Sequence, residues 1–133
     1  GDVYKRQTVA NGKTPTPTLI EGHETKASDK PQQISKPVLD NVRGMMRQVV
    51  TNGTARSMAA GGTIYGKTGE AEINEGSHAW FTGYREEDDI AFATLVVLGG
   101  GSDVSVNITS NFLQKVDDYR SGPHEGAAPP AEG

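Results

Sequence analysis

The sequence predicts an α/β fold of the α+β sandwich type, in which an antiparallel sheet is flanked by helices. Apolar residues recur at helical spacing in residues 35–52 and again after residue 102. Between them, residues 63–98 contain three segments of strand-like composition, separated by short turns. Consecutive strands joined by short turns pair in antiparallel fashion. The 133 residues are enough for one small domain.

The helix predicted for residues 35–52 has one apolar stripe and one polar face. Ser35 can cap its start, and Asn52-Gly53 can end it with a left-handed residue. Arg43 and Arg47 are expected to form its solvated face, and its methionines to fill the core. The stripe expected to face the core consists of Val38, Leu39, Val42, Met45, Met46, Val49 and Val50.

Three strands are predicted for residues 63–73, 78–84 and 89–98. Residues 74–77 are expected to form a turn, and residues 85–89 the charged tip of a hairpin. The third segment is apolar at nearly every position, which is typical of a strand buried on both faces. It is therefore expected in the middle of the sheet.

The last helix is expected to begin at a cap formed by Ser102 or Asp103. Residues 121–133 are rich in proline, glycine and alanine and are predicted to be a disordered tail. The apolar face predicted for this helix consists of Val104, Ile108, Phe112, Leu113, Val116 and Tyr119.

The beginning of the chain is expected to hold little structural information. Residues 1–7 have no useful periodicity and are interpreted as a translated adaptor scar, a sequencing or cloning artefact. Residues 8–13 can be the end of a helix, because Asn11-Gly12 is a common helix stop. The chain begins with Gly1 rather than methionine, so it is expected to be a fragment.

Composition narrows the range of partners. The net charge is -4 and no basic stripe is present, which argues against binding nucleic acid. Without cysteine the chain can form neither disulfides nor thiolate metal sites, and no cofactor or metal is expected. No apolar run approaches the roughly 20 residues that span a bilayer.

Residues 61–69 contain most of the chemistry in this sequence, and two functions can be inferred from them. Gly61, Gly66, Lys67 and Thr68 match the phosphate-binding pattern G-x-x-x-x-G-K-[ST]. A phosphate loop needs a buried strand before it and a helix after it. The residues before Gly61 make a poor strand, and those after Thr68 alternate as a strand does, so this interpretation is disfavoured.

The second interpretation places the same residues on a strand that lines a ligand site. Lys67 would supply a cation, Thr68 a hydrogen bond to a carboxylate, and Gly69 the room for a ligand to approach. The backbone N–H of Glu70 could then donate to an oxyanion. The alternative is an edge strand with an exposed lysine and a bulge glycine, because Lys-Thr-Gly alone is too short to be specific.

Longer blocks favour the ligand site. Residues 65–72 (YGKTGEAE), 77–84 (SHAWFTGY) and 91–99 (AFATLVVLG) resemble, in this order, the C-terminal part of class B penicillin-binding proteins. The upstream blocks 9–13, 16–20 and 45–55 are similar to the same family. The resemblance is strongest to actinobacterial forms that carry a nuclear-transport-factor-like module before the transpeptidase domain.

The resemblance implies part of a penicillin-binding, serine β-lactamase-like transpeptidase fold, with residues 8–120 as the C-terminal portion of the domain. It implies a D,D-transpeptidase that acts through a serine ester on peptidoglycan stem peptides and is acylated by β-lactams. Lys67 would balance charge, Thr68 would bind the substrate carboxylate and Glu70 N–H would complete the oxyanion hole. Trp80 is expected mainly to pack, and His78 to be a polar residue at a strand edge.

The resemblance also implies a place at the extracytoplasmic face of the cell membrane. Membrane association would come only through chain that precedes this sequence, and partners could include divisome or elongasome proteins. A β-lactamase or a β-lactam sensor domain of the same fold remains an alternative.

The family's nucleophile is not found in this sequence. The family carries S-x-x-K and S-x-N before Lys-Thr-Gly, and no S-x-x-K occurs in these residues. The triplet Ser105-Val-Asn107 matches S-x-N but follows Lys67, so it is interpreted as chance. The fragment alone is therefore expected to be inactive.

Overall fold

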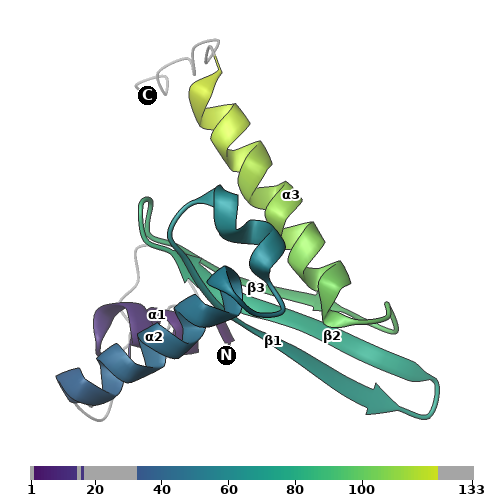
Figure 1. The fold of residues 1–133 in the computed structure, drawn as a ribbon, viewed down its shortest axis with the longest axis horizontal. Coiled ribbons are helices and arrows are strands. Elements are labelled where there is room, and N and C mark those ends of the chain that lie inside the picture. The colour runs from purple at the N-terminus through teal and green to yellow at the C-terminus, as the bar shows by residue number, and fades with distance from the viewer. Residues whose placement is uncertain (1, 15, 17–32, 123–133) are drawn as a thin grey trace, which may run out of the picture.

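The computed structural model describes residues 2–14, 16 and 33–122. This part of the chain forms an antiparallel sheet of three strands in the order β1-β2-β3, flanked by helices, as the sequence predicts (Figure 1). In chain order the elements are α1 (Asp2–Asn11), α2 (Lys36–Thr51), the 3-10 helix η1 (Arg56–Gly61), β1 (Ile64–Ile73), β2 (Gly76–Arg85), β3 (Ile90–Val96) and α3 (Ser102–Ser121).

Two tight hairpins fix the order of the strands. The first turn pairs Ile73 with Gly76, and the second pairs Arg85 with Ile90. A chain that turns back twice in this way must place the second strand between the others. The prediction that the apolar third segment lies in the middle of the sheet is therefore wrong for the described chain. In β3 only Phe92 is buried, and Leu95 is 45% exposed.

The core lies on one face of the sheet, under α2, η1 and α3 (Figure 1). The rings of Phe81 and Phe92 meet there with their centroids 5.3 Å apart. Helix α1 contacts the opposite face, where Arg6 donates to the hydroxyl of Thr82, the strand neighbour of Phe81. The core cluster consists of Val50, Ala55, Met58, Ile64, Phe81, Phe92, Val106 and Leu113.

Helix α2 is confirmed, but its ends differ from the prediction. Ser35 occupies the N-cap position without a side-chain hydrogen bond. Asn52 closes the helix at φ -132, and Gly53 is not among the residues of positive φ, so there is no left-handed stop. The N–H of Asn52 donates to the carbonyl of Gln48 at 2.9 Å, which satisfies that carbonyl directly.

The two arginines of α2 are not a solvated face, which corrects the prediction. Arg43 donates to the carbonyls of Val9 and Ala10, the last turn of α1. Arg47 donates through Nη1 to the carbonyl of Ile64 at 2.8 Å. Carbonyls at a helix end or a strand edge lack ladder partners, and a guanidinium satisfies them well.

Only part of the predicted apolar stripe of α2 is buried. Leu39, Met46 and Val50 lie in the interior. Val38 is 53% exposed and Met45 60% exposed, so Met45 does not fill the core of the described chain. The stripe is wider than the area of sheet that α2 covers.

The predicted apolar face of α3 is confirmed at Leu113 and wrong at Ile108, Phe112 and Tyr119. Its buried residues are Ser105, Val106, Thr109 and Leu113, whereas Ile108, Phe112 and Tyr119 are exposed. The hydroxyl of Thr109 lies 2.6 Å from that of Thr94 on β3, so the helix can bury a polar residue against the sheet at little cost. The N-cap residue is Gly101, and neither Ser102 nor Asp103 caps the helix.

Helix α1 ends at Asn11, as predicted, and Gly12 follows it at φ +76. The helix begins at Asp2, inside the segment interpreted as an artefact. That interpretation stays a prediction, because residues of adequate propensity extend a helix whatever their origin. Nearly all of the predicted tail, residues 123–133, lies outside the described residues. No described helix is long and apolar enough to span a membrane.

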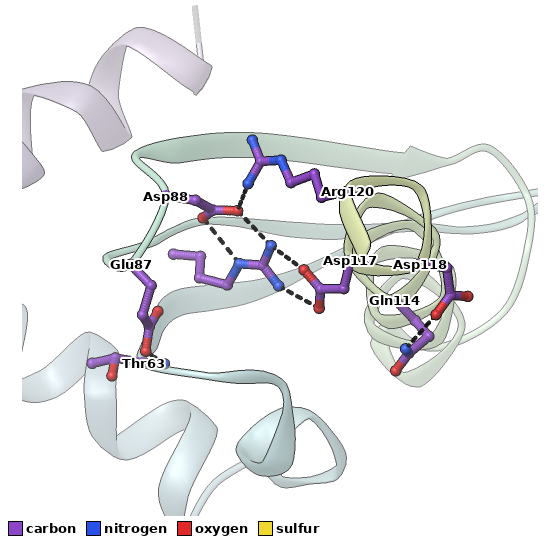
Figure 2. A network of polar contacts seen from close by, with 8 residues as sticks. Thr63, Glu87, Asp88, Gln114, Asp117, Asp118 and Arg120 are labelled. Atoms are coloured by element: carbon purple, nitrogen blue, oxygen red, sulfur yellow. Dashed lines mark hydrogen bonds and ion pairs between the residues drawn. The ribbon is translucent and has the colours of Figure 1, made fainter. Parts of the chain in front are cut away.

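Arg85 belongs to β2 and is only 5% exposed, although the sequence places it at a charged hairpin tip. Its guanidinium donates to both Asp88, in the turn, and Asp117, on α3 (Figure 2). Arg120 donates to Asp88 at 2.6 Å from the same helix. We call these four side chains the Arg85 cluster, and they fasten α3 to the end of the sheet.

Candidate active site

Residues 61–69 lead from η1 into a strand and do not form a phosphate loop. Gly61 ends η1, and β1 runs unbroken from Ile64 to Ile73. β1 continues past Thr68 to Ile73, so no helix starts directly after Thr68 to offer its N–H groups to a phosphate, and the nucleotide interpretation is wrong. Gly66 is explained by packing, because a Cβ there would lie 2.7 Å from the ring of Phe81.

The outer edge of β1 carries backbone groups that take no part in the pairing with β2. The carbonyl of Thr63 accepts from the N–H of Glu86 at 3.1 Å and so points toward the partner strand. The carbonyls of Ile64 and Thr68 accept from the side chains of Arg47 and Lys67, so they point outward.

In an antiparallel strand the N–H and C=O of one residue point to the same side, and the side alternates. The residues with outward backbone groups are therefore Gly66, Thr68 and Glu70. No described strand pairs with this edge. The N–H of Glu70 is thus free of the β1–β2 ladder, as an oxyanion donor must be.

A pocket of about 380 Å³ lies beside this part of β1. It brings together three of the residues predicted for the site, Lys67, Thr68 and Gly69. Glu70 is the next residue along the strand and does not line the pocket. The lining residues are Arg6, Lys67, Thr68, Gly69, Trp80 and Thr82.

The charge of the pocket suits an anion. Lys67 is exposed, and its Nζ donates to the carbonyl of Thr68 at 2.6 Å. Arg6 adds a second cation, and no carboxylate is among the lining residues. Arg6 belongs to the segment interpreted as an artefact, so the chemistry below depends on Lys67. The described residues contain no cluster that could hold a metal ion.

Thr68 and Gly69 shape the wall of the pocket. Thr68 is 7% exposed, and its Oγ1 lies 2.8 Å from Oγ1 of Thr54. A Cβ on Gly69 would meet Trp80 at 3.4 Å, an ordinary contact, so neighbouring side chains do not demand glycine. The missing side chain instead leaves the surface beside Trp80 open.

The structure adds Thr82 and Thr54, which the sequence did not single out. Trp80, expected mainly to pack, also lines the pocket, where the register sets it opposite Gly69. Thr82 lies opposite Lys67, and a correct hairpin register would have found it. No sequence pattern pointed to a contact between Thr54 and Thr68, because that contact depends on how α2 packs against β1.

Two further polar residues of the sequence lie away from the pocket. His78 accepts through Nδ1 from the N–H of Leu98 at 3.2 Å and does not line the pocket. Ser105 donates to the carbonyl of Ser102 at 2.8 Å on α3, which covers the opposite face of the sheet. The Ser105-Val-Asn107 triplet therefore has no place at the site.

Comparisons with known proteins bear on the family and the fold of this chain. A family model described as penicillin binding protein transpeptidase domain matches residues 5–114. The D,D-transpeptidase domain of a peptidoglycan glycosyltransferase from Eggerthella lenta is similar, with a TM-score of 0.70 and 26% identity over 90% of this chain. Pseudomonas aeruginosa PBP2, solved in complex with WCK 5153, has a TM-score of 0.66 and 25% identity over 92% of this chain.

The chain spans about a third of these structures, 31% of the first and 30% of the second. No curated protein matches it significantly.

Proposed function

Because this chain belongs to the penicillin-binding protein transpeptidase family, we propose that it forms the C-terminal portion of a serine D,D-transpeptidase domain that cross-links peptidoglycan. The serine nucleophile and its lysine would come from preceding chain, because these residues contain no S-x-x-K. The 133 residues alone would then be inactive. This chain spans only 31% and 30% of the two similar structures, which supports the proposal that further chain completes the domain.

The single observation that carries the proposal is the outward edge of β1. Lys67, Thr68 and the N–H of Glu70 follow one another along it, beside a pocket lined by cations. An acyl-transfer site needs these groups in this relation: one anchor for a substrate carboxylate and one donor for the oxyanion, a few ångströms apart.

In the proposed mechanism the stem peptide lies along this edge. The serine oxygen attacks the carbonyl carbon of the scissile amide, and the carbonyl oxygen becomes an oxyanion that accepts from Glu70 N–H. Thr68 donates its hydroxyl hydrogen to the terminal carboxylate, and Lys67 adds its positive charge. Collapse expels the leaving amine, which takes up the proton lost by the serine, and leaves a serine ester. An acceptor amine then attacks the ester, forms the new amide bond and returns a proton to the serine oxygen. A β-lactam would enter by the same first step.

Fluorescent penicillin labelling of the complete protein that contains this chain tests the proposal. We expect a covalent adduct and expect Lys67→Ala to slow its formation by about 10- to 100-fold, as loss of a charge-assisted contact does. Lys115→Ala, an exposed lysine on α3, is the matched control and should label at the normal rate. Unchanged labelling of Lys67→Ala would contradict the assignment of the site.

The lifetime of the adduct separates transpeptidase from β-lactamase. Hydrolysis needs a base that activates water, and none of the residues that line the pocket supplies a carboxylate or histidine for it. We therefore expect a long-lived adduct. Rapid turnover of penicillin would instead select the β-lactamase alternative. A long-lived adduct without cross-linking of stem peptides would select the sensor alternative.

We also propose that the parent protein is of class B, with the nuclear-transport-factor-like module of actinobacterial forms. It would act at the extracytoplasmic face of the membrane, anchored by preceding chain and in company with divisome or elongasome proteins. The sequence blocks at residues 65–72 and 77–84 support this finer assignment. The coding sequence before Gly1 tests it, because it should encode that module.

A further inference from the structure

Thr54 touches the proposed carboxylate anchor from outside the pocket. It lies between α2 and η1, 14 residues before Thr68, and the two Oγ1 atoms are 2.8 Å apart. Thr68 is 7% exposed, whereas Thr54 is an exposed residue. Thr54 does not line the pocket, and its contact with the site runs through Thr68.

We propose that Thr54 is a positioning residue that directs the hydroxyl hydrogen of Thr68 toward the carboxylate of the substrate. The proposal rests on the function proposed above, in which Thr68 binds that carboxylate. It adds a residue outside Lys-Thr-Gly to the recognition of the substrate.

The number of hydrogens on the two hydroxyls decides which of them donates to the other. A threonine hydroxyl has one hydrogen to donate and two lone pairs that accept. A carboxylate only accepts, so Thr68 must give its single hydrogen to the ligand. The hydrogen between the two threonines must then come from Thr54. Donation from Thr54 also polarises the Thr68 hydroxyl, which strengthens its bond to the anion.

The loop that carries Thr54 is held firmly against α2. The N–H of Ala55 donates to the carbonyl of Val49 at 3.0 Å, and Ala55 is fully buried. A Cβ on Gly53 would lie 2.9 Å from backbone atoms of Val49, so the chain passes there closer than another residue allows. Both neighbours of Thr54 are thus fixed, and its hydroxyl is held in place before a ligand arrives.

The experiment compares acylation of the complete protein by benzylpenicillin and by its methyl ester, which lacks the anionic carboxylate. Thr54→Val keeps the shape of threonine and removes its donor. We expect this variant to react about 5- to 10-fold more slowly with the acid, the loss expected for one neutral hydrogen bond. The rate with the ester should change by less than about twofold. Thr54→Ser keeps a hydroxyl and should restore the rate with the acid.

A purely structural role predicts something else. Equal losses with acid and ester, or a rate with the acid equal to wild type, would overturn the proposal. If Thr54→Val does not fold, Thr54→Ala and Thr54→Ser give the same comparison, and equal rates for these two with the acid would overturn it.

Thr68→Val separates this inference from the proposed function. If Thr68→Val slows the acid and Thr54→Val does not, only the role of Thr54 fails. If Thr68→Val also leaves the rate unchanged, the carboxylate anchor itself is wrong. The double variant should be no slower than Thr68→Val alone, because Thr54 acts only through Thr68.

Discussion

Arg85 and Asp117 are joined by two parallel hydrogen bonds, from Nη1 to Oδ2 at 2.9 Å and from Nη2 to Oδ1 at 2.7 Å. The first residue ends β2 and the second lies on α3, 32 residues later. The Arg85 side chain is 6% exposed and that of Asp117 is 43% exposed, so the guanidinium is shielded from water while the carboxylate stays partly solvated. The geometry is the bidentate one that a guanidinium and a carboxylate prefer.

Removing Arg85 should therefore destabilise the fold strongly. Arg85→Met leaves Asp88 without its main partner, and loss of one member of a buried ion pair costs about 3 kcal/mol. The measurement is the free energy of unfolding in urea. Arg56→Met, at an exposed arginine of η1, is the control and should change it by less than about 0.5 kcal/mol. Equal stability of the two variants would show that the Arg85 cluster does not fasten α3.

The same cluster should make stability depend on pH. Hydrogen bonds from Arg85 lower the pKa of Asp88 in the folded state. In the unfolded state the pKa of the Asp88 carboxyl is about 3.9, so around that pH the unfolded state binds more protons than the folded state does. The contribution of Asp88 is therefore full above the unfolded pKa and is lost as the pH falls through the folded pKa.

Asp88→Asn tests this sign. At pH 7 we expect it to lower the free energy of unfolding by roughly 2 kcal/mol, the value of hydrogen bonds to a charged group. As the pH falls below the unfolded pKa and toward the folded one, the stabilisation from the charged carboxylate is progressively lost, and the difference should shrink. Denaturant unfolding at pH 7 and near pH 3 measures both values. A difference that grows on acidification would contradict the role of Asp88.

Replacing Gly83 and Gly44 by alanine should change the stability of the fold in opposite directions. A Cβ on Gly83 would lie 2.1 Å from the carbonyl oxygen of Tyr65, within the β1–β2 ladder. Gly83→Ala must push the strands apart and should cost more than about 2 kcal/mol. Gly44 lies inside α2, and a Cβ there would meet no atom within 4 Å outside its own helical turn. Gly44→Ala should raise stability by about 0.5 to 1 kcal/mol. The midpoint of thermal unfolding, compared with that of the wild type, measures both changes.

Replacing Glu70 with proline tests whether its backbone N–H donates to the oxyanion. Its N–H points away from β2, so Glu70→Pro removes no ladder bond, and an edge strand tolerates proline at such a position. The variant should keep its far-UV circular dichroism and lose about 100- to 1,000-fold in the rate of penicillin acylation, the value of one oxyanion donor. Glu70→Ala keeps the N–H and should label within about threefold of wild type. Rapid labelling of a folded Glu70→Pro would remove Glu70 from the oxyanion hole.

Local chemistry explains which parts of the fold were predictable. The helix stop at Asn11-Gly12, the two hairpins and the extended state of Lys67-Thr68-Gly69 follow from residues that lie next to one another in sequence. Turn residues and periodicity act over a few positions, so they can be recognised without knowledge of the rest of the chain. The pattern around Lys67 also resembled the family that the comparisons show.

Packing explains the errors. The apolar content of β3 indicated a central strand, but two hairpins left it at the edge of the described sheet. On α3, apolar Phe112 is exposed and polar Thr109 is buried, because a hydroxyl on β3 lies where Thr109 can reach it. Hydrophobicity indicates which residues favour burial, but the surface against which a helix or strand packs decides which of them are buried.

The sequence by itself determined an extended Lys67-Thr68-Gly69 between two helices, since strand alternation and turn residues are local properties of the chain. Only the tertiary structure decided that Thr54 reaches Thr68 and that Arg85 reaches Asp117. These contacts join residues 14 and 32 positions apart, from different elements. Their distances are set by how α2 and α3 pack on the sheet, and no spacing in a sequence records that packing.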